Sequence, residues 1–256
     1  MQHHHLSKSH IIITVLAILA IIGIFLYRVY KSPTPSVSVV ETPTETPAST
    51  QWGSQEIKSE TLNESNQYYT ITAEYPVTKD PGIAATLKAF ASDAVAQFKD
   101  DVAWVMDPGA GASASDGSLS LDISYREQKT SALETYIFSI TTYTGGAHGL
   151  QVTKTFTYDK DSKAIGVLDL FSNGQKGLDT VATFVQGEIT KKKISDAAWI
   201  KDGAAPTVDN YKNFVVGDDG ITFIFDAYQV APYAAGIQNI LVPTSVFASF
   251  ANKALF

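Results

Sequence analysis

Residues 118–158, SLSLDISYREQKTSALETYIFSITTYTGGAHGLQVTKTFTY, decide the expected fold of this chain. Residues 118–125 alternate strictly between polar and apolar side chains, and residues 133–143 and 152–158 continue the same two-residue period. That period is typical of strands that bury one face of a sheet. The run 159–163 (DKDSK) has the composition of a tight turn. We therefore expect three successive strands at the centre of a β-sheet.

On either side of these strands the pattern also predicts helices. Residues 67–77 predict one further strand, and from Pro81 apolar side chains recur at spacings of three and four as far as Val105. This spacing is that of an amphipathic helix, and proline is tolerated in a first helical turn. Residues 177–194 predict a second helix with the same spacing of apolar residues.

The last part of the chain predicts a hairpin, a final strand and a short helix. Residues 213–216 and 221–228 flank the turn 217–220 (GDDG), residues 237–242 form the final strand, and the helix begins at Pro243. Antiparallel strands interrupted by two main helices make an α+β fold, because the regular alternation of a doubly wound sheet is missing.

Residues 11–27 (IIITVLAILAIIGIFLY) form an apolar run without a charge. Extended to residue 30 as a helix, the run is roughly 30 Å long, which matches the hydrocarbon core of a bilayer. A cleaved signal peptide is the alternative, but its apolar core usually has about 7–15 residues. We expect a transmembrane helix over residues 11–30, with the lipid bilayer as its partner.

Residues 31–66 are expected to form a stalk. Four of the ten prolines lie in its first half, interleaved with Ser and Thr, and such a composition cannot build a core. Lys8 before the apolar run, against Arg28 and Lys31 after it, favours a cytoplasmic C-terminus. The stalk favours the opposite orientation. We expect residues 1–10 as a short cytoplasmic tail and an extracytoplasmic domain at the cell membrane.

The composition excludes several classes of function. A formal charge of −7, from 19 basic and 26 acidic residues, disfavours general nucleic-acid binding, which needs a basic face. Without cysteine, the chain has no disulfide, thiol nucleophile or thiolate metal site. Four of the five histidines precede the apolar run, so the expected domain contains only His148. A two-histidine metal site is thereby excluded, and neither a metal nor another cofactor is expected.

Two motifs add information beyond periodicity. The first is YTGGAHG at residues 143–149, followed by VLDLF at residues 167–171, and the second is YQVAPYAAG within residues 211–243. In this order and spacing they resemble the extracytoplasmic domain of RsiV-type anti-sigma factors, which sense lysozyme. They also resemble the N-terminal module of PdaC-type peptidoglycan deacetylases. The resemblance covers roughly residues 67–250.

The resemblance implies a shared binding module rather than either parent activity. RsiV-type proteins carry a sigma-binding cytoplasmic domain, whereas only residues 1–10 precede the apolar run here, and PdaC-type proteins continue into a catalytic domain beyond the equivalent of Phe256. The shared module is expected to bind a lysozyme-like protein or a cell-wall glycan. We expect a first α+β subdomain at residues 67–145 and an RsiV-like C-terminal α+β subdomain at residues 146–256.

Gly145, Gly146 and His148 are the first candidate ligand-binding residues. Glycines allow positive φ, so they predict a tight turn at the end of a strand. His148 is either a general base or ligand on an exposed loop, or a structural histidine that ties the turn to neighbouring strands. No partner nucleophile can be assigned to it.

Tyr228 and Tyr233, on either side of Pro232, are the second candidates. They either form an aromatic platform that stacks on sugar rings or anchors a protein, or they pack on the sheet around a rigid bend.

Carboxylates are the third set of candidates, because a glycosidase needs two of them at a suitable separation. The conceivable members are Asp122, Glu134, Asp169 and Asp226. Asp169 also fits the role of a cap on a helical turn.

The sequence favours a membrane-anchored extracytoplasmic binding or sensing module over an enzyme. The alternative is a cell-wall-active hydrolase or deacetylase that uses His148 and carboxylates, with Asp169 as the partner. A third hypothesis is a stalked structural domain whose partner is another membrane protein.

Overall fold

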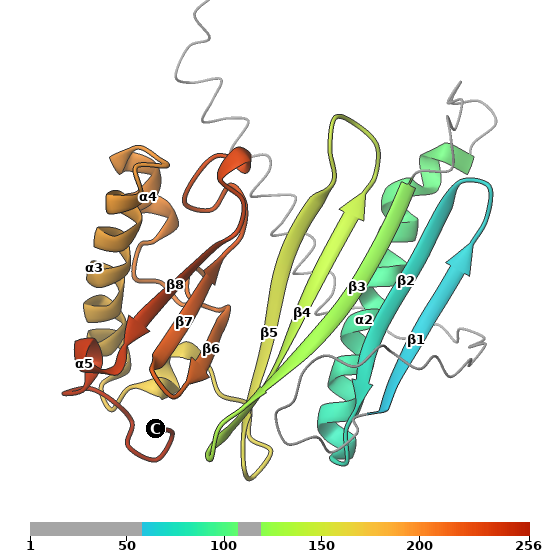
Figure 1. Ribbon diagram of the computed structural model, residues 1–256. Helices are drawn as coiled ribbons and strands as arrows, with labels where there is room; N and C mark the ends of the chain where they lie inside the picture. The colour runs from blue at the N-terminus through green and yellow to red at the C-terminus, as the bar shows by residue number, and fades with distance from the viewer. Residues whose placement is uncertain (1–57, 107–118) are drawn as a thin grey trace, which may run out of the picture.

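The computed structural model describes residues 58–106 and 119–256, which form two β-sheets with helices against each (Figure 1). The first sheet has five strands in the order β1-β2-β3-β4-β5 and the second has three, in the order β6-β7-β8. The strands of the first sheet are β1 (Lys58–Ser65), β2 (Tyr69–Val77), β3 (Leu119–Lys129), β4 (Leu133–Tyr143) and β5 (Leu150–Asp159). Those of the second are β6 (Phe214–Gly217), β7 (Gly220–Phe225) and β8 (Gln238–Pro243). The α+β class predicted from periodicity is confirmed.

The first sheet is mixed, which corrects the expectation of antiparallel sheets. Strands β2 and β3 pair in parallel, whereas the other neighbours in this sheet are antiparallel. The helix α2 (Pro81–Val102) lies between β2 and β3 in the chain, and parallel strands need such a crossover. Periodicity reveals which face of a strand is buried but not its direction, so the parallel pair could not be predicted from it.

Helix α2 packs along one face of the first sheet, as Figure 1 shows. It begins where Asp80 Oδ1 accepts the backbone N–H groups of Gly82 and Ile83, at 2.8 and 2.9 Å. Its inward side chains include Leu87 and Phe98, and the short 3₁₀ turn η1 (Ala103–Met106) follows it. The helix predicted from Pro81 to Val105 is confirmed.

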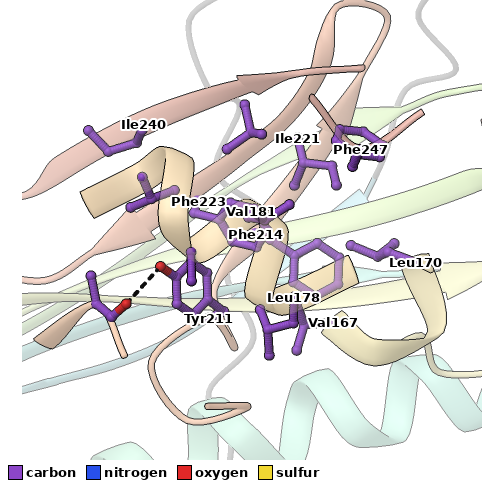
Figure 2. Close-up of a cluster of buried hydrophobic side chains, with 14 of the residues drawn as sticks. Val167, Leu170, Leu178, Val181, Tyr211, Phe214, Ile221, Phe223, Ile240 and Phe247 are labelled. Atoms are coloured by element: carbon purple, nitrogen blue, oxygen red, sulfur yellow. Dashed lines mark hydrogen bonds between the residues drawn. The ribbon is translucent and has the colours of Figure 1, made fainter. Parts of the chain in front are cut away.

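The second sheet has its own core against a long helix. The helical elements here are η2 (Val167–Leu170), α3 (Gly174–Lys192), α4 (Ala197–Gly203), η3 (Tyr233–Ala235) and α5 (Thr244–Phe247). Figure 2 shows Leu178 and Val181 of α3 facing the aromatic residues of β6 and β7. Tyr211 is fully buried in this core, and its hydroxyl donates to the Ala204 carbonyl at 3.0 Å.

The second sheet and the helical elements around it, from η2 to α5, are called the second unit, and the first sheet with α2 the first unit. Side chains of the second unit cover the outer edge of β5. The Asn213 amide accepts the Thr155 N–H at 3.2 Å and donates to the Thr153 carbonyl at 2.8 Å. Asp226 accepts the Thr153 N–H at 2.8 Å. Asn213 and Thr155 are both buried. The edge of the first sheet therefore ends on polar side chains and not on another strand.

Three predicted boundaries differ from the structure. Strand β1 lies inside residues 31–66, the expected stalk; its sequence KSETLNES has Leu62 as its single apolar residue, which is why no alternation marked it. The predicted boundary between residues 145 and 146 falls between β4 and β5 of one sheet. Apart from Leu133 of β4, the buried residues of the second core all follow β5 in the chain. Helix α4 lies between the helix predicted at residues 177–194 and the strand predicted at residues 213–216, where no element was predicted, because its seven residues are too few to show a period.

The predicted membrane segment, residues 11–30, and most of the predicted stalk lie outside the described residues. Among the helices of residues 58–106 and 119–256, none is long and apolar enough to cross a membrane.

Candidate functional site

His148, Tyr233 and Tyr228 form one aromatic stack at the end of the molecule where the β4–β5 connection lies. The rings of His148 and Tyr233 are stacked, with centroids 3.8 Å apart and planes 17° apart. The Tyr228 ring follows at 5.5 Å from Tyr233, tilted by 33°. His148 and Tyr228, at the two ends of the stack, are exposed. The fold thus joins the two motifs that the sequence presented as separate candidates.

The β4–β5 turn holds His148 in place. Gly145 and Gly146 have φ values of 101° and 103°, which L side chains rarely adopt, and this confirms the tight turn predicted from the glycines. The Tyr143 hydroxyl donates to the Gly146 carbonyl at 2.9 Å and closes the turn. A side chain at Gly149 would lie 2.9 Å from the Thr142 carbonyl oxygen, so this position needs glycine as well.

The segment between β7 and β8 holds the two tyrosines. Tyr228 has a φ of 69°, an unusual value for a bulky residue, and its carbonyl accepts the indole N–H of Trp199 at 3.0 Å. The Tyr233 hydroxyl donates to the Gly149 carbonyl at 2.9 Å, across 84 positions of sequence. Tyr228 is therefore hydrogen bonded to α4, and Tyr233 is hydrogen bonded to the β4–β5 turn.

His148 is both exposed and held by the backbone. Its Nδ1 donates to the Gly149 carbonyl at 2.9 Å, so in this tautomer Nε2 is a hydrogen-bond acceptor. In the described part of the chain, no carboxylate forms a hydrogen bond with this ring. The general base of a hydrolase is normally oriented by a third group, and here that group is a carbonyl. The ring is well placed to stack on a ligand, and its Nε2 can accept a hydrogen bond from it.

Three of the candidate carboxylates, Asp122, Glu134 and Asp169, have no hydrogen bond to the stack or to one another in the described residues. Asp169 is exposed on η2 and accepts the Gly166 N–H at 2.8 Å, which fits the capping role expected for it. Glu134 accepts the Tyr136 hydroxyl, and Asp122 is exposed on β3. Neither a hydrogen bond nor an ion pair joins His148 to Asp169 in the described residues, so the catalytic pair of the alternative hypothesis is not assembled.

Asp226 is the most perturbed carboxylate near the stack. Burial raises its pKa to about 6, although the Thr153 N–H and Lys212 favour the ionised form. The carboxylate faces the edge of β5 and accepts the Thr153 N–H there. Its environment is that of a structural group in the contact between the two units.

Two tryptophans beside the stack were missed by sequence reasoning. Trp199 lies on α4, whose start is marked by Asp196 as N-cap, and this cap was the available signal. Trp104 is 49% exposed on η1, and a Cβ on Gly145 would lie 3.9 Å from its ring. Residues from α4, η1 and the two turns thus add aromatic surface around the stack.

Metal binding has no structural support in the part of the chain that is described. No group of three or more His, Cys, Asp or Glu side chains is arranged there to hold an ion.

Comparison with known proteins finds a family model that matches part of the second unit. Residues 168–245 match the family model DUF3298, described as a protein of unknown function. This DUF3298 region runs from η2 to α5 and includes Trp199, Tyr228 and Tyr233, whereas His148 lies before it.

The chain is also similar to two named proteins. The peptidoglycan-N-acetylmuramic acid deacetylase PdaC of Bacillus subtilis is 30% identical over 240 residues, which cover 93% of this chain and 49% of PdaC. The immunogenic protein MPT64 of Mycobacterium tuberculosis is 33% identical over 106 residues, which cover 41% of this chain and 46% of MPT64. The chain therefore spans about half the length of these relatives.

Two solved DUF3298-family structures share the fold. One, from Bacteroides fragilis, has a TM-score of 0.56 at 20% identity and covers 77% of this chain and 93% of its own. The other, from Pseudomonas aeruginosa, has a TM-score of 0.53 at 17% identity and covers 79% and 97%. The specific relation to RsiV-type proteins stays a prediction.

Proposed function

We propose that this chain is a non-catalytic binding module of the bacterial cell envelope, anchored by residues 11–30, that binds peptidoglycan through the aromatic stack. The observation that carries the proposal is the stack itself, with His148 and Tyr228 exposed at its ends. Aromatic rings present flat apolar faces to sugar rings, and Tyr and His add a polar edge for hydroxyl groups. PdaC, whose name identifies peptidoglycan as its substrate, supports this choice of ligand.

The geometry favours binding over catalysis. In the described residues the ring of His148 is hydrogen bonded to a backbone carbonyl, and Asp169 caps a turn elsewhere. A cell-wall hydrolase or deacetylase would need a proton acceptor and a second group that converge on one substrate atom. The stack instead offers a flat aromatic surface that can bind and orient a ligand.

The first experiment is co-sedimentation of the full chain with insoluble peptidoglycan sacculi. The variant Tyr228→Ala should weaken binding about tenfold, because it removes the more accessible tyrosine of the stack. Phe256→Ala is the matched control: this aromatic residue is 40% exposed and contacts Phe247, away from the stack, so binding should be unchanged.

The sedimented glycan is then analysed for products. Intact glycan is expected. Deacetylated or cleaved glycan would favour the enzyme alternative, and His148→Ala would then abolish turnover. Saturable binding to a lysozyme-like protein, without binding to sacculi, would replace the proposed ligand with the protein ligand implied by the RsiV resemblance. The anchor is tested separately, by the resistance of the chain to alkaline extraction from membranes.

A further inference from the structure

A pocket of about 800 Å³ lies at the end of the β3–β4 hairpin opposite to the aromatic stack. Glu127, Lys129, Glu134 and Tyr136 line it, together with Lys58 and Lys79. The eleven-residue strand β3 separates this pocket from the β4–β5 turn, which at about 3.3 Å per residue amounts to more than 30 Å. The pocket is therefore a second place on the molecule and not an extension of the stack.

The pocket lies where the core face of the first sheet changes from apolar to charged. Along β3 the residues of this face are Leu121 and Ile123, both buried, then Tyr125, Glu127 and Lys129. Asp80, which caps the start of α2, also lines the pocket, so the pocket lies at the N-terminal end of the helix that covers this face. Beyond the apolar residues the same face carries two carboxylates, Glu127 of β3 and Glu134, which lies on β4 opposite Lys129.

Glu134 and Glu127 differ in the hydrogen-bond partners of their carboxylate oxygens. Glu134 Oε1 lies 2.7 Å from Lys129 Nζ and accepts the Tyr136 hydroxyl at 2.7 Å. The Glu127 side chain is only 9% exposed, and its Oε2 is buried without a hydrogen-bond partner within the described residues; the nearest cation, Lys129 Nζ, is 3.4 Å away. A buried carboxylate oxygen held only by a long ion pair is unfavourable compared with one that accepts a short hydrogen bond. Burial also raises the pKa of Glu127.

Lys129 shows what kind of group the two carboxylates accept. Its ammonium lies between Glu127 and Glu134, yet its side chain is 55% exposed and is thus able to turn into solvent. Lys58 and Lys79, which line the same pocket, have no ion pair among the described residues. The pocket therefore combines a position for an ammonium group, between Glu127 and Glu134, with two lysines that are available to bind an anion.

We propose that this pocket binds a small zwitterionic ligand whose primary ammonium group takes the position of the Lys129 Nζ between Glu127 and Glu134, and whose carboxylate lies toward Lys58 and Lys79. An ω-amino acid, or an amino-acid residue with a free side-chain amine, has this chemistry. Lys129 acts as an internal competitor that leaves when the ligand enters. The site goes beyond the proposed glycan binding and uses none of its residues.

The test is calorimetric titration of the full chain with Nα-acetyl-L-lysine, which carries one ammonium and one carboxylate. Glu127→Gln should weaken binding at least about tenfold, because the buried charge that the ammonium pairs with is removed. Lys129→Met should strengthen binding several-fold, because the internal competitor is removed. Nα,Nε-diacetyl-L-lysine, which lacks the ammonium, should not bind. Nα-acetyl-L-lysine amide, which lacks the carboxylate, should bind more weakly.

Glu188 and Lys191 on α3 supply matched controls, since they form a surface ion pair outside the pocket. Glu188→Gln and Lys191→Met should leave the affinity unchanged. The proposal is overturned if neither the original chain nor Lys129→Met binds the probe, or if the diacetylated compound binds equally well. Should Glu127→Gln fail to fold, Lys129→Met decides: tighter binding supports the site, and equal or weaker binding rejects it. Loss of the glycan-binding proposal would leave all these outcomes unaffected.

Discussion

The environment of Asp226 should make the free energy of unfolding of the protein depend on pH. Its pKa of about 6 in the folded chain lies above the value of about 4 for an aspartate in an unfolded chain. Between these two values the folded state binds more protons than the unfolded state. The contribution of Asp226 to the free energy of unfolding should therefore fall by about 3 kcal/mol as the pH rises from 4 to 6.

Asp226→Asn should remove this part of the pH dependence. Asparagine keeps an oxygen that accepts the Thr153 N–H but does not ionise. Urea unfolding at pH 4 and pH 7 should show a smaller decline for this variant than for the original chain. The control is Asp122→Asn on the exposed face of β3, which should keep the decline. Equal declines in all three proteins would contradict the assignment to Asp226.

Two glycines of helix α3 should respond in opposite ways to the same substitution. A Cβ at Gly177 would lie 2.3 Å from Cγ of Phe171, a buried ring, so Gly177→Ala should lower the free energy of unfolding by about 1–3 kcal/mol. Gly187 has nothing within 4 Å of such a Cβ, so Gly187→Ala should raise that free energy by about 0.5–1 kcal/mol through helix propensity. Thermal unfolding of both variants checks the pair, and a shift in the same direction would contradict it.

At the scale of elements, the outer edge of β5 depends on one amide side chain. Asn213→Ala would leave the Thr155 N–H and the Thr153 carbonyl without their partners at a buried edge. The free energy of unfolding should fall by about 2–3 kcal/mol. Asn239→Ala is the control, because Asn239 is exposed on β8 and should change stability by less than about 0.5 kcal/mol. Similar losses in both variants, measured by urea unfolding, would argue against the edge contact.

The elements that could be predicted from the sequence are those whose burial is one-sided. Strands β2 and β3 and helices α2 and α3 bury one face and leave the other more open, so their periods are visible in the chain. Strand β4 is buried on both faces in its first half, where Tyr136, Ile137 and Phe138 follow one another. Strand β1 is a polar edge strand and α4 has seven residues, so neither has a readable period. The direction of β3 relative to β2 depends on tertiary contacts, which no local pattern contains.

For the candidate site, the sequence predicted the participants better than their arrangement. The glycine turn and the pair Tyr228 and Tyr233 were marked by local composition. The stacking of His148 on Tyr233 joins positions 85 residues apart in numbering, and only the docking of the second unit on β5 creates it. Glu127 was missed because a charged residue on a strand is expected in solvent, and the structure buries it.

At the scale of the whole molecule, the two units should unfold together. Leu133 of β4 belongs to the core of the second unit, and Asn213 and Asp226 satisfy the edge of the first. In a Trp52→Phe background, Trp104→Phe leaves Trp199 to report on the second unit, and Trp199→Phe leaves Trp104 to report on the first. The two fluorescence transitions in urea should have the same midpoint, whereas separate midpoints would show independent units.

Strand β1 gives the molecule a mechanical property. Any tension that arrives through residue 57 acts first on Lys58, the start of an edge strand that pairs only with β2. Peeling β1 away withdraws a single apolar side chain, Leu62, from the first core, while Glu60 and Glu64 lose their bonds to the tyrosines of β2. The eight residues released would lengthen the connection by about 27 Å. Under tension the molecule would therefore first lengthen by the release of β1, before β2 to β5 separate from one another.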